Sequence, residues 1–437
     1  MPDDRSRSPE TDPADRDYVL SRLARKVPGV GVADTASGQL DMLRLRAYRL
    51  GRLQAELQKL DVGGILLGDA INIRYATGVR NMQAWSLHAL IRMAFVPTEG
   101  KAVCFEYAGS EHLAQPLETV AEVRPSGGTY RAGVKRDATG ERDPAVVAWA
   151  VQIAELVRQQ GSKRLAIDRM IGHFVALALS DQGLTLVAGG PALGQAQAIK
   201  SADEIQCITL AVAATETGMA RMRDALQPGI TENELWAVLN GTNIALGGEY
   251  SDTRLLSSGG RTNPWYQEAT DRRVRPGELV SFDTDMIGPF GYDADISRAF
   301  FCGPGRPSAE QRRLYRTAYE QLQHNLALVR PGRAFREMSE LAFRLPEAFW
   351  PNQMAMTWHG VGLYGQWPTI VGYKHYKPDS GLDGVVQPGM VLCCESYVGA
   401  VGGLEGVKLE QQLAVTEDGY ELLTTFPFED ELLGREL

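Results

Sequence analysis

The sequence lacks long apolar runs, an N-terminal secretory signal and CxxC cysteine spacing, the features expected of a membrane protein or a secreted protein. No apolar run reaches the ~18 residues that a helix needs to cross a bilayer. Residues 1–17 are polar and lack the apolar core of a secretory signal, and we expect them to form a disordered tail. The five cysteines show no CxxC spacing, which argues against a disulfide framework. We therefore expect a cytoplasmic protein with free thiols and no membrane partner.

Positive charge is also scarce. Lysine and arginine number 45 against 54 aspartate and glutamate residues, so the formal net charge is −9. This balance argues against a nucleic-acid partner. A chain of 437 residues exceeds what one hydrophobic core usually spans, and we expect two folded domains.

The first domain is expected over residues 18–197. Leucines recur at helical spacing over 41–60, and a second amphipathic helix is expected over 145–160. Short apolar runs at 93–96 and 103–107 are separated by a turn and predict a hairpin. Alternating helices and strands predict an α/β domain with a mixed sheet.

The second domain, residues 198–437, begins at a boundary near Lys200. Ser201 is placed to cap a helix, and Thr231 with Glu234 has the spacing of a capping box. After these helices the pattern changes to short strands, with one helical stretch at 308–329. This predicts an α+β domain with helices on a mostly antiparallel sheet. The expected strands are 277–287, 297–303, 390–398 and 409–416.

Acidic residues stand inside an expected hairpin of this domain. Asp283 and Asp285 are two residues apart, so their side chains share one face of a strand. A turn at Gly288 follows, and the returning strand should bring Asp295 opposite the first acid. Carboxylates gathered on a buried face repel one another unless a cation lies between them. The hairpin therefore predicts a metal site, and a solvent-facing polar hairpin is the alternative.

Three more candidate ligands follow in the chain. His359 has Gly360 and Gly362 close by, which allow close backbone approach. Glu395 and Glu410 stand in apolar strands, where a carboxylate needs a partner. A carboxylate-dominated site favours Mn, Fe or Co over zinc. The nearby cysteines are not at ligand spacing.

The order of these residues resembles the pita-bread fold of methionine aminopeptidases, prolidases, aminopeptidase P and creatinases. The resemblance implies a pita-bread catalytic domain preceded by a creatinase-type α/β N-terminal domain. It implies two divalent metal ions and a homodimer. The family's first metal-binding Asp falls where this chain has Thr284, so Asp283 and Asp285 compete for that position or share it. The implied metal ligands are Asp283, Asp285, Asp295, His359, Glu395 and Glu410.

Two departures point away from peptide hydrolysis. Peptidases that resemble this chain carry a His where it has Trp265, and a second His where it has Gln366. A closer resemblance is to the subgroup of lyases that split dimethylsulfoniopropionate (DMSP), a small carboxylate with a sulfonium group, into dimethyl sulfide and acrylate. The segments that carry it are 71–85, 259–268, 282–300, 359–368 and 388–410.

This resemblance implies that a base removes the proton beside the carboxylate while aromatic rings hold the sulfonium. The subgroup's proposed base, an Asp, is replaced here by Gly365. Tyr364 and Asp285 are the remaining candidates for the base. Candidate aromatic residues for substrate binding are Trp85, Trp265, Tyr266, Trp358 and Trp367.

Two other functions stay open at this point. One is a metallohydrolase that cuts Xaa-Pro or another small amide with a metal-bound hydroxide. The other is a non-catalytic binding protein with the pita-bread fold.

Overall fold

The computed structural model describes residues 40–126, 143–378 and 383–435. The predicted tail at 1–17 lies outside them. The described residues form two compact units that divide between Gln197 and Ala198. No helix in these described ranges is long and apolar enough to span a membrane.

The N-terminal unit is a mixed sheet with helices. Its strand order is β4-β3-β2-β1-β5-β6. The predicted hairpin is confirmed, because β2 and β3 pair antiparallel, whereas β1, β5 and β6 run parallel. The helices are α2 (Met42–Lys59), α3 (Ala70–Thr77), α4 (Gln83–Ser86), α5 (Pro144–Gln159), α6 (His173–Asp181) and α7 (Gly190–Ala198). The strands are β1 (Gly64–Leu67), β2 (Met93–Pro97), β3 (Ala102–Glu106), β4 (Val120–Pro125), β5 (Arg164–Ile167) and β6 (Thr185–Ala188).

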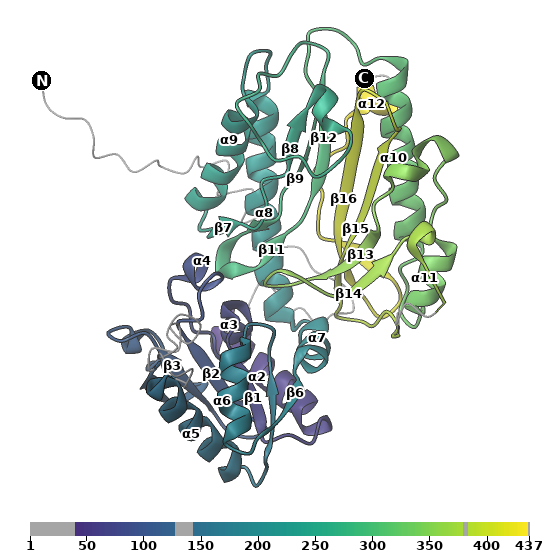
Figure 1. Ribbon diagram of the computed structural model, residues 1–437. Helices are drawn as coiled ribbons and strands as arrows, with labels where there is room; N and C mark the ends of the chain where they lie inside the picture. Colours follow the sequence, from purple (N-terminus) through teal and green to yellow (C-terminus); the bar gives the residue numbers. More distant parts are fainter. Residues whose placement is uncertain (1–39, 127–142, 379–382, 436–437) are drawn as a thin grey trace, which may run out of the picture. The chain divides into compact units, whose positions relative to one another are not determined.

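The C-terminal unit is built from antiparallel strands with helices on both sides. In Figure 1, α8 and α9 lie on one side of its strands and α10 and α11 on the other. The helices are α8 (Ala202–Ala225), α9 (Glu232–Ala245), α10 (Ala309–Ala327), α11 (Phe335–Leu341) and α12 (Asp430–Leu433). Two short sheets contain β7 (Tyr250–Ser251), β8 (Leu256–Ser258), β9 (Leu279–Asp283), β10 (Met286–Ile287), β11 (Asp293–Ala294) and β12 (Ser297–Phe301). The third sheet contains β13 (Met356–Val361), β14 (Gly365–Val371), β15 (Val391–Gly399), β16 (Gly406–Val415) and β17 (Tyr420–Leu422).

The helix starts of this unit follow the predicted capping chemistry. The Ser201 hydroxyl accepts from the Glu204 amide, and the Glu204 carboxylate accepts from the Ser201 amide. Thr231 and Glu234 form the same reciprocal pair at α9. Each pair satisfies backbone donors that a helix end leaves open, and this fixes where α8 and α9 begin.

The acidic hairpin forms, but its predicted register is wrong. Asp283 pairs with Ser297, and Met286 pairs with Ala294. The same register places Asp285, not Asp283, opposite Asp295. Pairing breaks between these two stretches, where Asp285 takes a left-handed backbone conformation with φ of 38°.

Candidate metal centre

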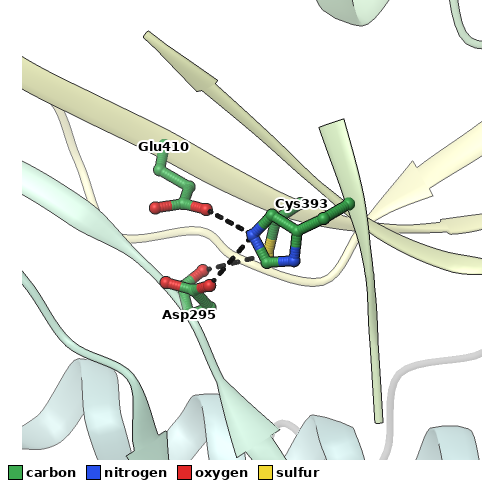
Figure 2. A group of neighbouring side chains, drawn as sticks. Asp295, Cys393 and Glu410 are labelled. Carbon is green, nitrogen blue, oxygen red and sulfur yellow. Dashed lines mark hydrogen bonds and ion pairs between the residues drawn. The ribbon is translucent and has the colours of Figure 1, made fainter. Parts of the chain in front are cut away.

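The predicted ligands come from strands of the C-terminal unit and from the residues that join them, and they converge beneath one pocket. His359 Nε2 lies 3.2 Å from Asp295 Oδ2, 3.6 Å from Glu410 Oε1 and 3.9 Å from Glu395 Oε1. Figure 2 shows the Asp295 and Glu410 carboxylates in one group with Cys393. Three overlapping sets have ligand atoms within 4.8 Å of one another. They are Asp295–His359–Cys393–Glu410, Asp283–Glu395–Glu410 and Asp283–Asp285–Asp295.

Strand pairing explains how residues far apart in the sequence meet. Glu395 on β15 pairs with Glu410 on β16, and His359 on β13 pairs with Cys393 on β15. Asp283 ends β9, whose partner β12 packs against β16. The hairpin acids therefore face the carboxylates of the larger sheet.

The donor atoms fit a cation. Asp295 Oδ1, Glu395 Oε1 and Glu410 Oε1 are buried and accept no hydrogen bond within the described residues. Burying a carboxylate oxygen without a partner is costly, and oxygen-rich groups of this kind suit divalent metal ions. Asp283, Asp295 and Glu410 each belong to two of the three sets, so the sets form one continuous group of candidate ligands.

Crowding and burial shift the pKa values of these groups. Burial, followed by the charges of Glu410 and Asp285, raises the pKa of Asp295 well above its ordinary value. Burial and the neighbouring Asp283 raise the pKa of Asp285 to about 8. Burial opposes ionisation of Glu410, but Lys408 and His359 hold its pKa below the ordinary range. The ligand cluster thus contains both ionised and proton-retaining carboxyl groups when no metal is bound.

Lys408 was not anticipated from the sequence. Its fully buried ammonium lies 3.1 Å from Asp283 Oδ2, 2.9 Å from Glu395 Oε2 and 2.8 Å from Glu410 Oε2. Burial lowers the pKa of Lys408, but the three carboxylates raise it well above its ordinary value. It also donates to the Ser297 hydroxyl at 2.8 Å. Lys408 is therefore a built-in cation that offsets part of the cluster's negative charge.

Two more residues near the ligand cluster were missed. Asp293 is buried, and its Oδ1 has no hydrogen-bond partner among the described residues. Cys393 corrects the expectation that no cysteine is at ligand spacing, because its sulfur belongs to the set with Asp295, His359 and Glu410. The Cys393 thiol donates to the Asp295 carbonyl at 3.5 Å.

A cavity of about 430 Å³ opens over the cluster. Trp265, Tyr266 and Trp367 line it, as three of the predicted substrate-binding residues. Tyr364 and Asp285, the candidate bases, line it too. The cavity wall also contains Gly365, where a Cβ would lie 3.7 Å from His359 Nδ1. A side chain at Gly365 would therefore reach the site.

One of the predicted aromatic residues lies outside this pocket. Trp358 is fully buried in the hydrophobic core behind the sheet. It neighbours His359 on β13, and adjacent residues of a strand point to opposite faces, so its prediction as a substrate contact is corrected. Trp85 belongs to the N-terminal unit, where α4 leaves its side chain half exposed. Its part in substrate binding stays a prediction.

Comparison with known proteins places this geometry in a family. Residues 206–417 match the family described as "Metallopeptidase family M24". The chain is 39% identical over 403 residues to the dimethylsulfoniopropionate lyase DddP of Roseovarius nubinhibens, covering 90% of this chain and 89% of the relative. It is 34% identical to the enzyme of that name from Roseobacter denitrificans, covering 91% and 89%.

The chain belongs to metallopeptidase family M24. The M24 fold is also seen in solved structures. A prolidase from Thermococcus sibiricus has a TM-score of 0.72 at 22% identity, covering 90% of this chain and 99% of that one. An Xaa-Pro dipeptidase from Bacillus anthracis has a TM-score of 0.69 at 19% identity, covering 88% and 99%. This M24 protein therefore has the pita-bread fold with a preceding α/β domain.

Proposed function

We propose that this M24 protein is a metal-dependent carbon–sulfur lyase that splits DMSP, or a similar small β-substituted carboxylate, into dimethyl sulfide and acrylate. The observation that carries the proposal is the 39% identity over 90% of the chain to a DMSP lyase. The pocket supports it, because Trp265, Tyr266 and Trp367 line the cavity together with predicted metal ligands. The family resemblance adds that Gln366 stands where similar peptidases carry a His.

The residues that would hold two divalent ions are the six predicted ligands, with Asp283 and Asp285 sharing one position or competing for it. We propose Fe, Mn or Co in preference to zinc. A divalent ion held by these residues would supply positive charge that makes the C–H bond beside the substrate carboxylate more acidic. The Cys393 sulfur lies within 4.8 Å of a ligand atom of Asp295, of His359 and of Glu410. The metal preference is therefore best measured for the wild type and for Cys393→Ser in parallel.

The protein side chains supply binding and proton transfer. Asp285 or Tyr364 takes the proton from the carbon beside the carboxylate. The electron pair of that C–H bond forms the double bond of acrylate, and the C–S pair leaves with sulfur as neutral dimethyl sulfide. Trp265, Tyr266 and Trp367 face the sulfonium, with a cation–π attraction of roughly 0.5–2 kcal/mol per ring.

The base is identified by comparing Asp285→Asn with Tyr364→Phe. The variant that lacks the base should have a kcat lower by about 100-fold or more. Its kcat should also no longer depend on the ionisation of the substituted side chain. The other variant should keep the pH profile. An unchanged profile in both variants would exclude both residues as the base.

A second candidate function is a metallohydrolase of the Xaa-Pro type, which the structural likeness to prolidases favours. Purified protein loaded with Fe, Mn, Co or Zn should be given DMSP and, separately, a panel of Xaa-Pro dipeptides. The lyase proposal predicts dimethyl sulfide in the headspace and no dipeptide turnover above the metal-free background. Dipeptide turnover without dimethyl sulfide would replace it with the hydrolase.

A further inference from the structure

A buried ammonium lies behind the pocket wall, and the proposed chemistry does not use it. Lys200 follows α7 and is 4% exposed. Its Nζ donates to the Ala198 carbonyl at 3.3 Å and to Gln366 Oε1 at 3.2 Å. None of the ion pairs within the described residues includes Lys200. Burial lowers the pKa of Lys200 to about 8, with the Glu204 charge opposing the shift, so the group is mainly an ammonium at neutral pH. A positive charge thus stands directly behind a residue that lines the cavity.

The ammonium determines which way the Gln366 amide faces. An ammonium group only donates hydrogen bonds, so the oxygen of the amide must be the atom that meets Lys200. The nitrogen Nε2, with its two N–H groups, is then turned away from Lys200. Within the described residues no acceptor pairs with Nε2, and it is not among the buried atoms that lack a partner. Gln366 therefore presents a free donor to the cavity.

The donor stands close to the metal centre. Gln366 on β14 pairs with Gly360, which follows His359 on β13. Both His359 and Gln366 line the same cavity. A neutral donor backed by a buried cation suits an anion, because N–H groups next to a fixed positive charge bind a carboxylate more strongly than a neutral oxygen.

We propose that Gln366 Nε2 binds the substrate carboxylate and that Lys200 is a positioning residue that fixes the amide for this task. The inference deepens the proposed function by naming what recognises the carboxylate end of the substrate. It rests on the proposed function only in that the substrate is a small carboxylate.

The test uses binding rather than turnover. Acrylate and its neutral isostere acrylamide are titrated calorimetrically into the metal-loaded full-length protein. Wild type should prefer acrylate. Gln366→Glu keeps an acceptor for Lys200 but removes the N–H donors, and should weaken acrylate binding by about 10- to 100-fold. Acrylamide binding should change little.

Lys200→Met should weaken acrylate binding by several-fold, and Lys200→Arg should restore it. Lys374→Met is the matched control, because Lys374 also donates to backbone carbonyls but, within the described residues, donates no hydrogen bond to Gln366. Metal content is measured for every variant so that loss of metal is distinguished from loss of the donor. Gln366→Met keeps the inference testable if Lys200→Met does not fold.

Equal acrylate affinity in wild type, Gln366→Glu and Gln366→Met would overturn the inference. So would a wild type that does not prefer acrylate over acrylamide. If the protein forms no dimethyl sulfide from DMSP, that result contradicts the proposed function but not the proposed carboxylate site. If acrylate discrimination depends on Gln366 and Lys200 while DMSP is not cleaved, the carboxylate site stands and the substrate is a different carboxylate.

Discussion

At the scale of single residues, the alternation of side chains along a strand explains which residues of the site were predicted from the sequence and which were missed. Residues two apart on a strand share a face, and this rule linked Asp283 with Asp285. The same rule applies to Asp293 beside Asp295, Cys393 beside Glu395 and Lys408 beside Glu410. Cys393 and Lys408 contact the ligand cluster, Asp293 is buried two residues before Asp295, and alternation along each strand was the signal that could have found them.

Lys408→Met should strongly destabilise the metal-free protein. Removing one partner of a buried ion pair leaves uncompensated charge and costs roughly 3–5 kcal/mol. Lys408→Arg keeps the charge and should lose less. Urea unfolding in the presence of a chelator measures both variants. A Lys408→Met protein as stable as wild type without metal would show that the ammonium does not offset the carboxylates.

The stability of the metal-free protein should fall as pH rises through the range between the unfolded and folded pKa values of Asp285. Its pKa is raised from 3.8 to about 8, so the folded state holds a proton that the unfolded state releases. The stability that this group contributes is fully present below about pH 4 and is lost as pH approaches about 8.

Between those limits the loss is up to about 1.4 kcal/mol per pH unit. Asp285→Asn removes one of the carboxyl groups with a raised pKa and should reduce the slope of stability against pH, measured by urea unfolding with a chelator present. If the variant shows the same slope as wild type, Asp285 is not the group responsible.

At the scale of elements, local chemistry predicted helices better than strand registers. Capping boxes at Ser201 and Thr231 act between residues three apart, so the sequence alone located the starts of α8 and α9. The acidic hairpin depends on a backbone break at Asp285, with φ of 38°, which residue spacing does not reveal. Trp358 was wrongly predicted for a related reason. Whether its side chain meets the pocket or the core depends on which side of β13 the core covers, and residue spacing does not reveal this.

Ser201→Ala should cost about 1 kcal/mol of stability, because it leaves an N-terminal backbone donor of α8 without its acceptor. Ser308→Ala at the start of α10 is the matched comparison, since Ser308 also forms a capping box. Thermal unfolding of both variants measures the loss. Unchanged stability in Ser201→Ala would mean that water replaces the cap without cost.

At the scale of the whole molecule, the two units have separate cores. One core is formed by residues between Leu66 and Leu184, and the other by residues from Ala198 onward. Two domains were expected from the length of the chain, with a boundary near Lys200; the two compact units divide between Gln197 and Ala198. The homodimer expected from the family resemblance remains a prediction, and light scattering of the purified protein would measure it.

Metal binding should stabilise the C-terminal unit selectively, because every ligand in the cluster lies there. A metal ion present at a free concentration of about 100 times its dissociation constant stabilises the folded state by about 2.7 kcal/mol. Hydrogen exchange with and without metal should therefore slow in residues 198–435, with residues 41–126 and 143–197 unchanged. Equal protection of both units would contradict a metal site confined to the second.

The most direct test is a metal titration of chelator-treated protein with DMSP present. The account predicts that dimethyl sulfide and acrylate appear in equal amounts, rise with bound Fe, Mn or Co, and are absent without metal. Asp295→Asn should remain folded, fail to retain metal and form neither product. If the folded, metal-loaded wild type releases no dimethyl sulfide with any metal, the protein is not a DMSP lyase.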